Sequence, residues 1–149
     1  MKKKRLVALA LVMTLAVSAS MFVATKEVAP ELLAAEEITR KIFGANAENG
    51  EREQEVLQAS YLQGLDEESD YIIVNSSIGG YAIFERAGME LIEYSDKNAS
   101  PYAKDDGSAY YAGTTNYYRK ENEKFKHIYS GEKFEKAQMR EVAKTVKEE

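Results

Sequence analysis

Tyrosine is the residue type with the clearest chemical use in this sequence. Ten tyrosines are present. A tyrosine combines a rigid apolar ring with a hydroxyl tip, so it is enriched on surfaces that bind proteins or carbohydrates. The alternative is that the rings pack as half-buried strand residues at the edge of a small core, which we expect for most of the six that lie after residue 100. These six are Tyr102, Tyr110, Tyr111, Tyr117, Tyr118 and Tyr129.

Catalytic and metal-binding chemistry lacks its usual residues. The sequence contains no cysteine and a single histidine, His127, and no serine lies in a G-x-S-x-G motif. A lone histidine beside Lys126 is more typical of an exposed or structural residue than of a catalytic one. A zinc site needs three or four His, Cys or carboxylate ligands. We therefore expect a protein that is not an enzyme, with no catalytic residue, no metal and no cofactor.

The charge distribution limits the class of partner. The formal net charge is −5. From Lys26 to Tyr118 there are 7 basic and 18 acidic side chains, a net of −11, whereas Arg119–Glu149 carries 9 basic and 7 acidic side chains. Phosphate binding needs a basic face, so the acidic body argues against nucleic acid as a partner and is compatible with a basic protein.

The N-terminus has the pattern of a targeting segment. Basic Lys2–Arg5 precedes the apolar run Leu6–Val17, and small residues follow at Val17-Ser18-Ala19. This order predicts a signal peptide over residues 1–24. The alternative is an uncleaved anchor, because Leu6–Ala24 spans 19 mostly apolar residues.

Whether residues 1–24 are cleaved as a signal peptide or kept as an anchor, we expect the rest of the chain to be secreted or associated with the cell envelope. Residues 25–29 form a short lead-in, and residues 30–149 have the length of a single domain. We expect no membrane contact once a signal peptide is removed. The oligomeric state does not follow from the sequence.

The stretch from Tyr71 to Tyr94 predicts an antiparallel meander. Short runs rich in β-branched and aromatic residues are separated by turn residues, which is the pattern of strands joined by tight turns. Glycine adopts positive φ without strain, so we expect Gly79 and Gly80 to reverse the chain at the first turn and Gly88 at the second. The predicted strands are Tyr71–Val74, Tyr81–Phe84 and Met89–Tyr94.

Helices are expected on both sides of this meander. Pro30 and Glu31 suit the start of an amphipathic helix that ends near Phe43, and a second helix is predicted over Glu51–Leu62. A C-terminal helix is predicted over Glu132–Lys147. The fold class is therefore α+β, with N-terminal helices packed on a small antiparallel β-meander and a C-terminal helix. Short edge strands are expected at Ala109–Gly113, Asn116–Arg119 and Lys126–Tyr129.

The central pattern resembles a known family. A strand at Tyr71–Val74 is followed by Gly79-Gly80-Tyr81-Ala82-Ile83-Phe84 and then by Leu91-Ile92-Glu93-Tyr94-Ser95. This order, with Ser100-Pro101-Tyr102 and the tyrosine-rich Tyr110–Tyr118, is similar to the propeptide domain of streptopain-type cysteine peptidases of Gram-positive bacteria and to their free-standing propeptide-like inhibitors. In full-length members a catalytic domain with Cys and His follows, and this sequence has no cysteine.

The resemblance implies a secreted, non-catalytic module that binds, and can inhibit, a secreted cysteine peptidase. The motifs shared with the family are structural ones. The family's inhibitory contacts therefore cannot be assigned to particular residues of this sequence. From the tyrosine positions we predict a contact surface of Tyr81, Tyr94, Tyr102 and Tyr110, at the meander edge or in the loop after it. The alternative is an extracellular or cell-envelope module that recognises a wall polymer or another protein through its tyrosine-rich half.

Overall fold

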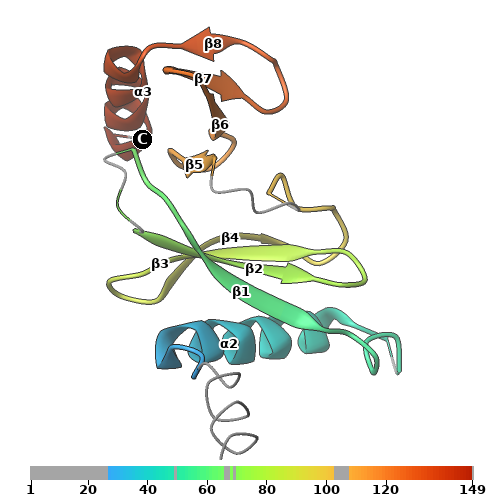
Figure 1. Ribbon diagram of the computed structural model, residues 1–149. Helices are drawn as coiled ribbons and strands as arrows, with labels where there is room; N and C mark the ends of the chain where they lie inside the picture. Colours follow the sequence, from blue (N-terminus) through green and yellow to red (C-terminus); the bar gives the residue numbers. More distant parts are fainter. Residues whose placement is uncertain (1–26, 49, 66–67, 69, 103–107, 149) are drawn as a thin grey trace, which may run out of the picture.

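The structure, a computed structural model, describes residues 27–48, 50–65, 68, 70–102 and 108–148. They form two sheets and two helices: α2 lies on one side of the first sheet, the second sheet lies on its other side, and α3 stands beside the second sheet (Figure 1). The elements are α2 (Pro30–Asn46), β1 (Leu57–Leu62), β2 (Tyr71–Ser76), β3 (Tyr81–Glu85), β4 (Glu90–Ser95), β5 (Ala109–Tyr111), β6 (Tyr117–Glu121), β7 (Lys124–His127), β8 (Lys133–Phe134) and α3 (Lys136–Glu148).

Helix α2 confirms the first predicted helix and covers one face of the first sheet. Pro30 occupies the first turn, and Ala35, Thr39 and Phe43 are buried at a spacing of four residues. The helix continues past Gly44, because the Gly44 carbonyl accepts a hydrogen bond from the Ala47 N–H at 3.4 Å and closes one more turn.

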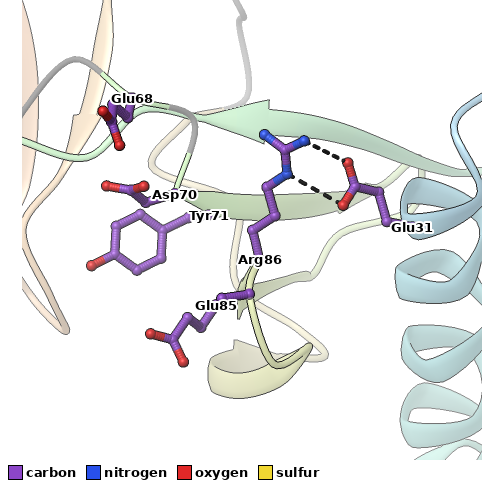
Figure 2. A pocket seen from close by; sticks show the side chains of 7 residues that line it. Glu31, Glu68, Asp70, Tyr71, Glu85 and Arg86 are labelled. Atoms are coloured by element: carbon purple, nitrogen blue, oxygen red, sulfur yellow. Dashed lines mark hydrogen bonds and ion pairs between the residues drawn. The ribbon is translucent and has the colours of Figure 1, made fainter.

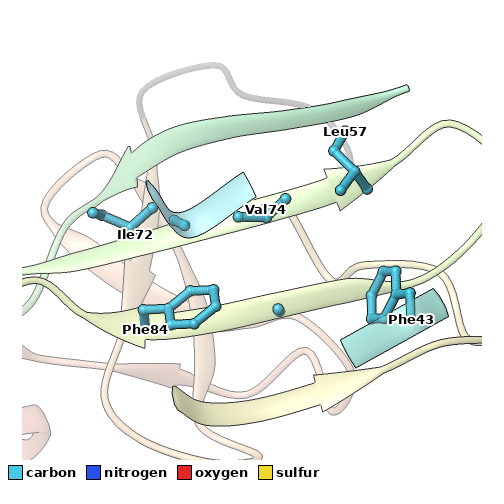
Figure 3. Close-up of a cluster of buried hydrophobic side chains, with 7 residues drawn as sticks. Phe43, Leu57, Ile72, Val74 and Phe84 are labelled. Carbon is cyan, nitrogen blue, oxygen red and sulfur yellow. The ribbon is translucent and has the colours of Figure 1, made fainter. Parts of the chain in front are cut away.

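The first sheet is an antiparallel meander in the order β1-β2-β3-β4, and its three predicted strands are confirmed. Neighbouring strand residues point to opposite faces. Ile72, Val74 and Phe84 pack on the helix side with Phe43, as Figure 3 shows. Ile73 and Ile83 face the second sheet instead. Both faces are therefore buried, which explains why these strands consist of continuous apolar runs.

The predicted helix over Glu51–Leu62 is wrong. The residues before Val56 form turns, and Leu57–Leu62 is strand β1, which pairs with β2 along its length. Leu57 and Ala59, two residues apart, both pack toward α2, which is the spacing of a strand. Pairing with β2 overrides the local helical pattern.

The layout of helices on a single meander is also wrong, although the α+β class is confirmed. The three segments that we expected to be short edge strands form β5, β6 and β7 of a second antiparallel sheet in the order β5-β6-β7-β8. Strand β8 takes the first residues of the predicted C-terminal helix, which begins only at Lys136. The C-terminal helix is present as α3, and its Met139 is buried against Tyr118 and Phe125 of this second sheet. The first sheet therefore lies between α2 and the second sheet.

Strand β1 links the two sheets. After pairing with β2 it forms a parallel bridge from Gln63 to Tyr110 of β5, and the Tyr111 N–H donates to the Gln63 carbonyl at 2.9 Å. The residues facing each other between the sheets include Leu62, Ile73 and Tyr111. This shared core holds the sheets together.

The predicted signal peptide lies outside the residues that the structure describes. No helix in the described part of the chain combines the length and apolar character needed to cross a membrane.

Candidate functional site

The four predicted contact tyrosines occupy different environments. Tyr102 and Tyr110 are buried, Tyr81 is half-buried, and Tyr94 on β4 is 46% exposed. Tyr102 and Tyr110 are therefore not available as contact residues in this fold, which corrects that part of the prediction. The physical reason is that Tyr110 of β5 packs with Met139 of α3, and Tyr102 packs in the core between the two sheets.

The buried tyrosines pack inside the second sheet and around it. The Tyr102 hydroxyl donates to the Tyr110 carbonyl at 2.6 Å, and the Tyr110 ring meets Phe125 edge-on with centroids 5.1 Å apart. Packing is thus confirmed as the role of most of the six late tyrosines. Tyr129 is the exception among them, at 66% exposed.

Glu93 gathers three of the tyrosines at the junction of the two sheets. The Tyr81 hydroxyl donates to Glu93 Oε1 at 3.2 Å, the Tyr111 hydroxyl donates to Oε2 at 3.0 Å, and the Tyr117 hydroxyl donates to Oε1. We call this group the Glu93 cluster. Charge-assisted hydrogen bonds of this kind are about twice as strong as neutral ones, so the cluster fixes β4 against the second sheet. Reasoning from the sequence identified Tyr81 as a contact residue and missed Glu93.

A β-bulge directs Glu93 into this cluster. The register between β3 and β4 shifts after Ile83, which lies opposite Glu93. The next residue, Phe84, lies opposite Leu91, so Ile92 is the extra residue. In a regular strand Leu91 and Glu93 would share one face. The bulge reverses the alternation, so that Leu91 packs toward α2 while Glu93 faces the second sheet.

The buried tyrosines predict a loss of stability in alkali. Burial raises the pKa of Tyr102, Tyr111 and Tyr117 above the ordinary value of 10.0, and the Glu93 carboxylate raises the pKa of Tyr111 and Tyr117 further. A pKa that is higher in the folded state stabilises the fold fully below pH 10 and loses this contribution as the pH rises above it. We expect the urea midpoint to fall above about pH 10, with tyrosinate absorbance appearing together with loss of circular dichroism. Titration of all tyrosines near pH 10 in an intact fold would contradict this.

Strand β4 forms an open edge of the first sheet. In the described part of the chain, no backbone hydrogen bond joins its outer side to another segment. The opposite edge strand, β1, is covered in part: the Ala59 N–H donates to Glu36 Oε1 at 3.0 Å, and the residue after β1 bridges to β5. On β4 the side chains of Ile92 and Tyr94 are exposed. An unpaired strand with exposed apolar side chains is a template for an added strand.

The loop after β4 is held firmly at its start. The Ser95 hydroxyl accepts hydrogen bonds from the backbone N–H of Lys97 at 3.4 Å and of Asn98 at 3.0 Å. Arg52 donates to the Asp96 carbonyl, and the backbone of Gly80 lies against Ser95. The end of β4 and the start of the loop therefore have a defined conformation.

An acidic basin of 780 Å³ lies at the other end of β4. Arg86 pairs with Glu31 at 3.0 Å, and Figure 2 shows Asp70 and Tyr71 on the other side of Arg86. Glu85, which also lines the basin, lies opposite Glu90, the first residue of β4. The structure contains no group of three metal-ligating side chains among its described residues. The basin is completed by Glu68 and Ala87.

Comparisons with known proteins do not assign the chain to a family. No family model, no curated protein and no solved structure matches it.

Proposed function

We propose that this chain is a secreted, non-catalytic, propeptide-like module that binds and inhibits a streptopain-type cysteine peptidase through the β4 edge. The observation that carries the proposal is the open β4 edge, with Ile92 and Tyr94 exposed on it. The sequence resemblance supplies the class of partner. The buried positions of Tyr102 and Tyr110 restrict the contact surface to the strand itself and the start of the following loop.

Strand addition accounts for binding without a catalytic group. A segment of the partner would pair with the outer backbone groups of β4, and its side chains would meet Ile92 and Tyr94. The Glu93 cluster and the anchored Ser95 hold β4 in place before binding. Preorganisation of this kind lowers the entropic cost of association.

The charge around β4 favours a basic partner surface. Glu90 begins the strand, and Glu85 and Asp70 extend the negative potential into the basin. Complementary charge mainly increases the association rate, and salt screens it. Inhibition by this chain is therefore expected to set in more slowly as ionic strength rises.

The proposal is tested by titrating a streptopain-type peptidase with the purified chain and with Ile92→Lys and Tyr94→Ala variants. A lysine on an edge strand opposes strand addition, and truncation of Tyr94 removes the exposed aromatic contact. We expect each variant to weaken inhibition by about tenfold or more. Val56→Lys and Tyr129→Ala change residues outside β4 that are more exposed than Ile92 and Tyr94. Both control variants are expected to inhibit like the unchanged chain. Absence of inhibition and of a complex with the unchanged chain would refute the proposal.

A second candidate function is recognition of a wall polymer or envelope protein. It is favoured by Tyr129, whose exposed ring is braced edge-on by Tyr117 at 5.7 Å. Exposed rings of this kind offer a stacking face. Retention on purified cell wall, lost in Tyr129→Ala and kept in Tyr94→Ala, would support this function; equal retention of both variants would oppose a role for Tyr129.

A further inference from the structure

His127, the single histidine of the chain, uses both ring nitrogens in hydrogen bonds. Nε2 lies 2.9 Å from the carbonyl oxygen of Thr115, and Nδ1 lies 3.1 Å from the backbone nitrogen of Ser130. A carbonyl oxygen can only accept, so Nε2 carries the hydrogen. The Ser130 N–H can only donate, so Nδ1 is unprotonated. The two contacts together require the neutral ring in one tautomer.

We propose that the neutral His127 ring holds the turn at residues 128–131 closed, and that protonation of the ring releases the Ser130 N–H. We call this contact the His127 latch. Uptake of a proton places an N–H at Nδ1, directly facing the Ser130 N–H. Two donors then oppose each other, so the hydrogen bond that closes the turn is lost while the Nε2 bond to Thr115 remains. This inference concerns a different part of the fold from the proposed β4 surface and does not depend on it.

Two aromatic rings pack against the imidazole. The Tyr118 ring of β6 packs edge-on against it at 5.2 Å, and the Tyr129 ring of the turn lies at 6.3 Å. The charged neighbours are Lys126, on the same strand, and Glu132, whose backbone carbonyl accepts the His127 N–H at 2.8 Å. In the described part of the chain, no carboxylate forms an ion pair with the imidazole. The added N–H at Nδ1 therefore has no ion-pair acceptor among the described residues.

The latch acts on a limited segment. Ile128 donates its N–H to the Tyr117 carbonyl at 2.9 Å, and Gly131 donates to the His127 carbonyl at 2.9 Å. These two bonds remain when the ring is charged, so the ends of the turn stay attached. The affected part is Tyr129 and Ser130, where the Ser130 hydroxyl still accepts from the Glu132 N–H at 3.3 Å and the Tyr129 ring still packs edge-on against Tyr117.

The test is nuclear magnetic resonance of the full chain between about pH 7.5 and about pH 5. The single imidazole gives one Cε1–H signal, so its protonation is followed directly. After correction for intrinsic exchange, we expect the Ser130 amide to exchange about tenfold faster once the ring is protonated, with little change at Ile128 and Gly131. Unchanged Ser130 protection with a protonated ring, or a ring that stays neutral throughout, would overturn the proposal.

Two variants separate the latch from general loosening of the turn. In His127→Asn the side-chain oxygen can still accept from Ser130 and does not titrate, so we expect protection at both pH values. In His127→Phe the ring volume is kept and the acceptor is absent, so we expect fast Ser130 exchange at both. If His127→Phe protects Ser130 like the unchanged chain, Nδ1 does not hold the turn and the proposal fails.

Discussion

Gly80→Ala is expected to destabilise this protein by about 3–5 kcal/mol. Gly80 has φ of +112°, and an added Cβ would lie 2.8 Å from the Ser95 carbonyl oxygen and 3.2 Å from a Phe43 ring carbon. The first cost is backbone strain, and the second is a collision with backbone that belongs to the end of β4. Urea denaturation followed by circular dichroism measures the change.

Gly88→Ala is the matched control for Gly80→Ala. The prediction that Gly88 supplies positive φ at the second turn is wrong: Met89, with φ of 52°, takes that conformation, and an added Cβ on Gly88 meets nothing within 4 Å. We expect Gly88→Ala to change the free energy of unfolding by less than about 1 kcal/mol, because alanine mainly restricts the unfolded chain. Similar losses in the two variants would show that crowding at Gly80 is not the cause.

Arg52→Ala is expected to cost about 3 kcal/mol or more. The Arg52 guanidinium pairs with Glu55, donates to the Asp96 carbonyl and lies 4.6 Å from the centre of the Phe43 ring. The Glu55 side chain is only 6% exposed, and it also accepts from the Ser76 hydroxyl at 2.6 Å. Removing the arginine leaves a buried carboxylate without its cation and also removes a cation–π contact.

Lys41→Ala is the control for the ion pair. Lys41 and Glu37 form a pair at 3.0 Å on α2 with side chains 75% and 65% exposed, so its loss should cost about 0.5 kcal/mol or less. Thermal and urea unfolding of the two variants give the comparison. The interpretation of Arg52 would be wrong if its replacement were as mild as that of Lys41, or if Arg52→Lys restored full stability despite losing the planar contacts.

The elements that were predicted correctly are those with local signals. Pro30 and Glu31 start α2, and the apolar runs bounded by glycines form β2, β3 and β4. The predicted helix over Glu51–Leu62 failed because the spacing of its apolar residues fits a helix as well as a strand. Pairing with the next strand, β2, which lies outside this segment, decides in favour of a strand.

The candidate site was predictable only in part. Tyr94 lies on the edge strand β4, whereas Tyr81 lies on the inner strand β3 and Tyr110 lies inside the second sheet. Adjacent tyrosines such as Tyr110 and Tyr111 point to opposite faces, and both faces are covered, one by α3 and the other by the first sheet. Which tyrosines are exposed depends on those covering layers.

By itself, the sequence determined the α+β class, the meander strands, the reversal at Gly80 and the acidic character of the body. These properties depend on a few neighbouring residues and on composition. Three features appear only in the tertiary structure: the second sheet, the open edge at β4, and the position of Glu93 among the tyrosines. Those properties depend on which distant segments pair and on one bulged residue, Ile92, and a register shift has no local sequence signal here.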